Sequence, residues 1–225
     1  MHRIDLILKE RQNRKFRSNW PWESYYQKST RADNLLEEIE NKIKSRKCIQ
    51  EARKQSVTSY ITAFEVYFKD TLLELLEMFG NNKIIEQIKL KFDVQEVERV
   101  IKEKVSINEV IASYFNFQDL DQINKAFSLI FDVSFFEELK NREFKIPNSK
   151  LSPFKIHKNF YKELKSFIDL RHDFVHDINF KKNITKAQLD KYTDIYSFFI
   201  IAVDMYVDEK IRDYSKKKKT ALRKK

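Results

Sequence analysis

The sequence contains few of the residues that build turns and covalent cross-links. Its 225 residues include one glycine, three prolines and one cysteine, Cys48. An all-β fold needs turn residues every ~8–12 positions, so this composition excludes one. Neither GxGxxG nor GxxxxGK can be written with one glycine, which excludes glycine-rich phosphate loops. One cysteine also excludes an internal disulfide framework and a zinc site with several cysteine ligands.

Long apolar runs are also missing. The longest, Phe198–Val203, covers about a third of a bilayer span. The basic segment at residues 1–15 is not followed by the apolar stretch of a signal peptide. Apolar residues nevertheless make up 42% of the chain, with 19 Phe and 10 Tyr, so a sizeable core is available. We therefore expect a soluble, reduced, cytoplasmic helical protein.

The net charge of +10 is concentrated at the two ends of the chain. Residues 211–225 carry eight basic residues against one acidic residue, and residues 1–20 carry six against two. The segment between them is nearly neutral. Basic ends attract polyanions such as nucleic acid, and the candidate contacts in the tail are Lys216, Lys217, Lys218 and Lys219. The alternative is a disordered tail that only keeps the protein in solution.

Apolar residues recur at intervals of three and four, which predicts helices and argues against strands. The predicted helices cover residues 22–47, 49–79, 83–92, 94–104, 107–116, 120–131, 135–141, 158–178 and 186–212, with the first two separate or fused. A loop at 142–157 contains Pro147 and Pro153, and residues 213–225 form a basic disordered tail. Capping boxes are predicted at Ser106/Glu109, Ser134/Glu137 and Thr185/Gln188, simple N-caps at Asp93 and Asp119, and a left-handed residue after a helix at Gly80.

Two long helices carry clear apolar stripes. The first stripe consists of Val57, Ile61, Phe64, Phe68, Leu72, Leu75 and Phe79. The second consists of Leu189, Tyr192, Tyr196, Phe199, Val203 and Tyr206. These stripes predict an all-α, antiparallel helical bundle. Residues 1–212 form one domain, in which the short helices at 83–157 are an insertion or a cap.

Residues 160–178 carry the candidate chemistry. Wound as a helix, this segment places its apolar residues within roughly 80° of one direction, and Arg171 falls near the centre of that arc. A buried unpaired charge costs several kcal/mol, so Arg171 needs a carboxylate partner or the arc must open onto a cleft. Glu65, at the edge of the first stripe, is the candidate partner. A purely structural Arg171–Glu65 pair between two helices is one interpretation.

His172 and His176 are one helical turn apart, on the flank next to Arg171. A histidine pair at this spacing can bind a metal ion with help from Asp169 or Asp173. No third ligand has a fixed spacing to this pair, so the sequence provides no complete metal site. We therefore expect no metal and no cofactor.

The segment Arg171-His-Asp-Phe-Val-His176 resembles the R-x4–6-H motif of the HEPN superfamily, with the usual polar residue after the arginine. The helix from Ser56 to Leu72 is similar to the long early helix of bacterial HEPN proteins of the RiboL-PSP type. In these proteins a glutamate in the middle of the helix commonly faces the motif arginine, which matches Glu65. The resemblance covers about 49–80 and 158–210, and 83–157 resembles no family.

The resemblance implies a HEPN-type bundle that dimerises through its motif helices. It also implies a metal-independent endoribonuclease, acting as a toxin or anti-phage effector with a possible antitoxin partner. His176 would move protons at neutral pH, and Arg171 would hold the phosphate. His172 would orient the phosphate or share the proton transfer, and Asp173 would fix the tautomer of His176. The alternatives are a catalytically silent HEPN-like binding module and an unrelated helical regulator.

Overall fold

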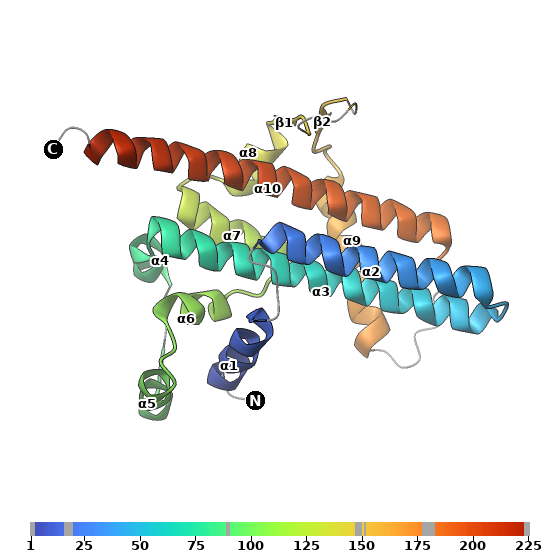
Figure 1. Cartoon of the computed structure of the whole chain (residues 1–225), viewed down its shortest axis with the longest axis horizontal. Helices are drawn as coiled ribbons and strands as arrows, with labels where there is room; N and C mark the ends of the chain where they lie inside the picture. The colour runs from blue at the N-terminus through green and yellow to red at the C-terminus, as the bar shows by residue number, and fades with distance from the viewer. Residues whose placement is uncertain are drawn as a thin grey trace.

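The computed structural model describes residues 3–15, 20–88, 91–146, 150, 152–176 and 183–222. This part of the chain is all-α apart from one short hairpin, as the sequence predicts (Figure 1). The helices are α1 (Arg3–Arg14), α2 (Pro21–Lys42), α3 (Arg46–Phe79), α4 (Asn82–Gln87), α5 (Val94–Lys102), α6 (Ile107–Tyr114), α7 (Leu120–Phe131), α8 (Phe135–Lys140), α9 (Phe160–His176) and α10 (Lys186–Leu222), and the strands are β1 (Glu143–Phe144) and β2 (Phe154–Lys155). None of these helices has an apolar stretch long enough to cross a membrane.

The body of the molecule is built from α2, α3, α9 and α10 (Figure 1). Helices that follow each other in the chain, α2 with α3 and α9 with α10, run antiparallel. By contrast, α3 and α10 run in the same direction, since Phe64 contacts Tyr196 and Phe79 contacts Tyr214. The expected antiparallel packing of these two stripes is therefore wrong for this pair, because α9 reverses the chain once more before α10 begins.

Both predicted stripes lie in the core. Six of the seven α3 stripe residues, Val57 to Leu75, are fully buried, and Phe79 is partly buried. Phe64 lies 4.7 Å from both Phe68 and Tyr196, measured between ring centroids. Burying one such side chain contributes about 1.5–3 kcal/mol, so this aromatic cluster is a principal source of stability.

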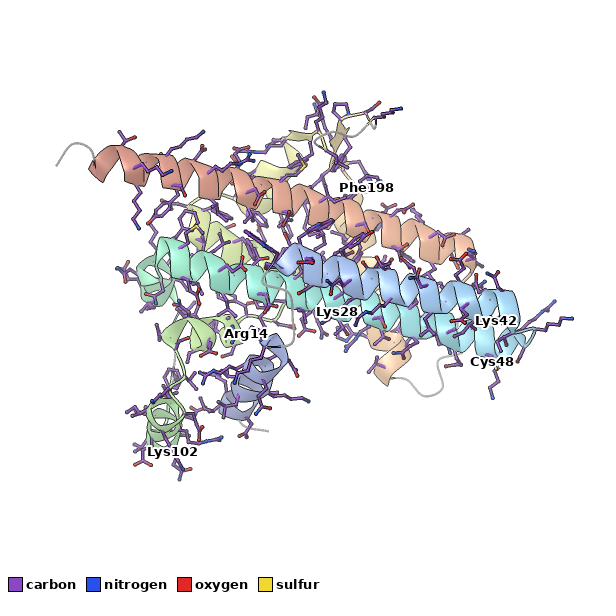
Figure 2. The ribbon with its side chains drawn as sticks, in the orientation of Figure 1. Arg14, Lys28, Lys42, Cys48, Lys102 and Phe198 are labelled. Atoms are coloured by element: carbon purple, nitrogen blue, oxygen red, sulfur yellow. The ribbon has the colours of Figure 1, made fainter. Side chains whose placement is uncertain are left out.

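A three-residue break, Ile43–Ser45, separates α2 from α3, so these helices are not fused. Cys48 is exposed near this turn (Figure 2). The last helix does not end near Arg212 but continues to Leu222, which corrects the expectation of a tail that is disordered from residue 213. Two features favour the longer helix: no glycine or proline interrupts it, and Tyr214 packs on Phe79 at 4.6 Å between ring centroids.

The helix ends follow most of the predicted signals. Capping boxes form at Ser106/Glu109 and Thr185/Gln188, and Asp93 forms another with Glu96. Asp119 accepts hydrogen bonds from two backbone N–H groups of α7. The box predicted at Ser134 is wrong, because its side chain makes no cap hydrogen bond. Gly80 follows α3 with a φ of 83° and a ψ of 176°, an extended positive-φ conformation that essentially only glycine adopts.

The region 83–157 divides into two parts. Helices α4, α7 and α8 pack against the main core together with the β1–β2 hairpin, which lies in the predicted loop. The other part, α5 and α6, meets α1 at a small second core of Ile4, Ile7, Val105 and Val110, and α6 also packs on α3. The sequence patterns predict neither α1 nor the hairpin. The apolar period of α1 is short, and each strand has only two residues.

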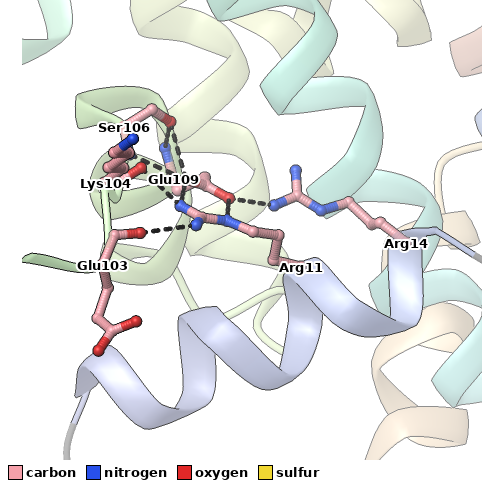
Figure 3. Close-up of polar contacts among 6 residues, drawn as sticks. All are labelled: Arg11, Arg14, Glu103, Lys104, Ser106 and Glu109. Atoms are coloured by element: carbon pink, nitrogen blue, oxygen red, sulfur yellow. Dashed lines mark hydrogen bonds and ion pairs between the residues drawn. The ribbon is translucent and has the colours of Figure 1, made fainter.

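Ion pairs attach α1 to α6 (Figure 3). Arg11 donates from Nε to Glu109 Oε1 at 2.9 Å and from Nη2 to Glu109 Oε2 at 2.6 Å. Arg14 Nη2 donates to Glu109 Oε1 at 2.7 Å. Arg11 also donates to the backbone carbonyls of Glu103 and Lys104, just before α6. The carboxylate that caps α6 thus also fixes the N-terminal helix.

Candidate active site

The apolar arc of α9 is buried within one chain. Phe160, Leu164, Phe167, Ile168 and Leu170 are buried against α3 and α10, and Phe174 is partly buried. Val175 is the described member that stays exposed, at 45%. The arc therefore does not need a second protein surface to cover it. The expectation of a dimer consequently rests on the family resemblance and not on an unburied stripe.

Arg171 is linked to Glu65, but through a third side chain. Arg171 Nη1 donates a hydrogen bond to Gln118 Oε1 at 3.1 Å, and Gln118 Nε2 donates to Glu65 Oε2 at 2.7 Å. No ion pair between the described side chains joins Arg171 to Glu65 directly, which corrects the expected pair. A neutral amide offers both a donor and an acceptor, so Gln118 can connect the cation to the carboxylate.

One N–H donor of the Arg171 guanidinium takes no part in these hydrogen bonds. Arg171 Nε is buried and has no hydrogen-bond partner among the described atoms. Leaving a buried donor unpaired costs about 1–3 kcal/mol. The arginine is therefore oriented through Nη1, while a further donor on the same group lacks an acceptor.

A cleft of about 730 Å³ lies between α7, α8 and α9; Arg171 does not line it but donates a hydrogen bond to Gln118, which does. Gln118 and His172 both line it, so the arginine chain and one motif histidine meet at its wall. From α9 the cleft also receives Lys162, Lys165 and Asp169. These residues and His172 are spaced by three, four and three positions, which places them on one helix face.

The charge of the cleft is negative in balance. Four carboxylates line it, those of Asp119, Asp121, Glu137 and Asp169. Against them stand Lys162 and Lys165, so the lining carries a net charge of −2 with His172 neutral. The cleft is therefore not a uniformly basic surface, and the lysines that line it are Lys162 and Lys165 of α9.

The other predicted catalytic residues occupy the last turn of α9. His172 is half-buried, and Asp173 is exposed. His176 is the last residue of α9, and its side chain lies outside the described part of the structure. The predicted contact between Asp173 and His176 lies outside it as well.

Within the described ranges, no group of three or more His, Cys, Asp or Glu side chains is arranged to hold a metal ion. The alternative of a His172–His176 metal pair involves the undescribed His176 side chain. It therefore stays a hypothesis, which chelation of the purified protein can test.

The lysines of the tail are distant from α9. Lys216–Lys219 lie on the exposed last turns of α10, whereas Tyr192 of the same helix stacks on Phe167, one turn before Arg171. The 24 residues from Tyr192 to Lys216 span about 36 Å at 1.5 Å per residue. The structure therefore does not bring the predicted lysine contacts together with the predicted catalytic residues of the same chain.

The sequence patterns do not predict the role of Gln118 or the cleft around it. Gln118 lies 53 positions from both Glu65 and Arg171, in a region without family resemblance, so no local pattern marks it. The α9 wall did leave a signal. The helical spacing of Lys162, Lys165, Asp169 and His172 could have indicated one polar face next to the motif.

Comparisons with protein families, with curated proteins and with solved structures found no match to this chain.

Proposed function

We propose that this protein is a metal-independent endoribonuclease whose active site is formed by Arg171, His172 and His176 on α9. One observation carries the proposal: Gln118, bonded in turn to Glu65, orients Arg171 and lines a cleft together with His172. A guanidinium held in this way is suited to binding a phosphodiester, because its remaining donors are fixed in one plane.

RNA supplies its own nucleophile, so the reaction needs acid–base groups and a cation but no metal. The 2′-OH attacks the adjacent phosphorus, a base takes its proton, and the 5′-oxygen leaves as it gains a proton. His176 is proposed as the group that moves a proton, with Asp173 setting its tautomer. Arg171 would stabilise the negative charge of the phosphorane, and His172 would orient the phosphate.

The biological role that we propose is that of a cytoplasmic toxin or anti-phage effector, which acts as a homodimer and is restrained by an antitoxin partner. This part rests on the resemblance of Arg171–His176 to the HEPN motif. Light scattering should give about twice the chain mass of 27.3 kDa. In such a dimer the motif residues of both chains would line one site; a monomer at micromolar concentration would refute this shared site and leave the α9 residues to act within one chain.

The test is RNA cleavage by the purified protein in EDTA, with the product ends analysed. We expect cleavage to persist and to leave 2′,3′-cyclic phosphates. His176→Ala should lower the rate by at least ~100-fold, the usual contribution of a positioned acid or base. Arg171→Lys should be inactive, because an ammonium cannot reproduce the planar two-pronged contact. Full cleavage by His176→Ala would refute the assignment, and loss of activity in EDTA would favour a metal site.

A second function, a silent nucleic-acid-binding module, is favoured by a separate observation. Lys216–Lys219 are exposed on the last turns of α10, where they can contact phosphates without any catalytic residue. If the protein binds RNA in a salt-dependent way but does not cleave it, this second function is supported.

A further inference from the structure

We infer that the cleft between α7, α8 and α9 binds a guanine base next to the phosphate held at Arg171. This inference rests on the proposed ribonuclease function and adds a substrate preference to it. The cleft is large enough for a base, at about 730 Å³, and it shares Gln118 and His172 with the candidate active site.

The charge of the cleft selects a base over a phosphate. Its lining carries four carboxylates and two lysines. A phosphate placed among the carboxylates would be repelled, whereas a neutral base would not. The phosphodiester therefore lies on the Arg171 side, and the cleft takes the attached base.

The hydrogen-bonding groups of the lining favour guanine among the four bases. Ionised carboxylates only accept hydrogen bonds, and the Watson–Crick edge of guanine presents two neighbouring donors, N1–H and the N2 amino group. Asn124 also lines the cleft, and its Oδ1 already accepts the backbone N–H of Phe136 at 2.9 Å. Its amide NH₂ is thus the part that can donate to guanine O6. Uracil, with one donor between two acceptors, matches this lining poorly.

An aromatic pair completes the cleft. The rings of Phe136 and Tyr161 stack at 4.4 Å with an angle of 11° between their planes, and both residues line the cleft. The Tyr161 hydroxyl donates to the backbone carbonyl of Phe136 at 2.9 Å, which fixes the ring. Proteins that recognise unpaired RNA bases commonly combine such aromatic surfaces with hydrogen bonds to the base edge.

The first experiment measures nucleoside binding, which needs neither a phosphate nor catalysis. Guanosine, adenosine, cytidine and uridine are titrated separately into isotope-labelled protein and followed by NMR. Guanosine should bind at least about fivefold more tightly than the others and shift the signals of α7 to α9. Equal or tighter binding of uridine, or no binding of guanosine, would overturn the inference.

The variants test the carboxylates. Asp121 and Asp169 are exposed on the lining, and their side chains make no hydrogen bond or ion pair that the structure describes. Asp121→Asn/Asp169→Asn should therefore keep the fold and weaken guanosine binding by about tenfold or more, because the amides offer the guanine N–H groups neutral acceptors in place of charged ones. Glu98→Gln on α5 also removes an exposed carboxylate, far from the cleft, and should leave guanosine binding unchanged. An unchanged guanosine affinity in the double variant would refute the role of these carboxylates.

The second experiment compares cleavage of short RNAs that differ in one base beside the cut. The wild-type protein should prefer guanine, and the double variant should lose this preference while still cleaving. If RNA is cleaved without guanosine binding and without base preference, the base site is refuted and the ribonuclease stands. If guanosine binds but no RNA is cleaved, the base site stands and the proposed ribonuclease fails.

Discussion

The two basic ends of the chain look similar in composition but differ in structure. At the N-terminus, Arg11 and Arg14 are both paired with Glu109, and Arg99 of α5 is paired with Asp5 of α1. At the C-terminus, Lys216–Lys219 are exposed and make no ion pair with any described residue. The first end attaches a helix to the body, and the second leaves its charge available to a polyanion.

The difference comes from the neighbours and not from the number of charges. Glu109 caps α6, and its side chain is only 9% exposed, so two arginines can satisfy it where water cannot. No carboxylate among the described residues forms an ion pair with Lys216–Lys219 in the last turns of α10. The net charge of a segment thus indicates an attraction to polyanions only where its basic side chains are not already paired with carboxylates from elsewhere in the protein.

The largest expected effect comes from removing Glu109. Glu109→Ala should lower the free energy for detaching α1 by about 3 kcal/mol, since it leaves two arginines without their partner and removes the α6 cap. Hydrogen exchange of the α1 amides would measure this loss. Glu98→Ala, which removes an exposed carboxylate from α5, is the matched control and should change protection little. Normal α1 protection in Glu109→Ala would show that the apolar second core alone holds the helix.

The same carboxylate predicts a pH dependence. Burial raises the pKa of Glu109, but hydrogen bonds from Arg11 and from the Ser106 backbone outweigh burial and lower it from 4.5 to about 2. Because the pKa is lower in the folded protein, the stabilisation is complete above about pH 4.5 and is lost as the pH falls towards about 2. The protection of α1 should decline in this window, and Glu109→Gln should remove most of that decline. A decline of the same size in Glu109→Gln would assign it to other carboxyl groups.

Much of the fold could be predicted from the sequence, because it depends on local patterns. The α3 stripe from Val57 to Phe79 follows from helical spacing. The caps at Asp93, Ser106 and Thr185 follow from short sequence patterns, because each of these side chains bonds to a backbone N–H only three residues further along the chain. The direction of α10 relative to α3 could not be predicted, because it depends on how α9 returns between them. The docking of α1 on α6 depends on Arg11 and Glu109, which are 98 positions apart.

The candidate site likewise contains residues that local patterns predict and residues that they do not. Arg171 and His172 could be selected because they lie within one helical segment with a recognisable motif. Gln118 could not, since its role appears only when α3 and α9 approach the turn before α7. Glu65 is an intermediate case. Its spacing predicts a direct pair with Arg171, but Gln118 lies between the two side chains, and no local pattern predicts such an amide.

A smaller effect on stability is expected at the C-terminal end. Replacing Lys216–Lys219 with glutamine keeps Tyr214, which packs on Phe79, so the free energy of unfolding should change by less than about 0.5 kcal/mol. RNA affinity should become less sensitive to salt. With about 0.7 per phosphate contact for single strands, the log–log slope should fall by up to about 3. Affinities measured by fluorescence anisotropy at several salt concentrations give this slope, and an unchanged slope would mean that the lysines only aid solubility.

The smallest effect is expected from the lysines at the N-terminal end. Lys9 is exposed on α1, and Lys15 follows that helix, with no ion pair described for either. Arg11 and Arg14 are already paired with Glu109, so Lys9 and Lys15 are the lysines at this end that can contact a polyanion. Replacing both lysines with glutamine should lower the salt slope by at most about 1.4, two contacts at 0.7 each. A decrease as large as that of the Lys216–Lys219 variant would mean that RNA contacts both ends equally, and that pairing with Glu109 does not decide which end binds.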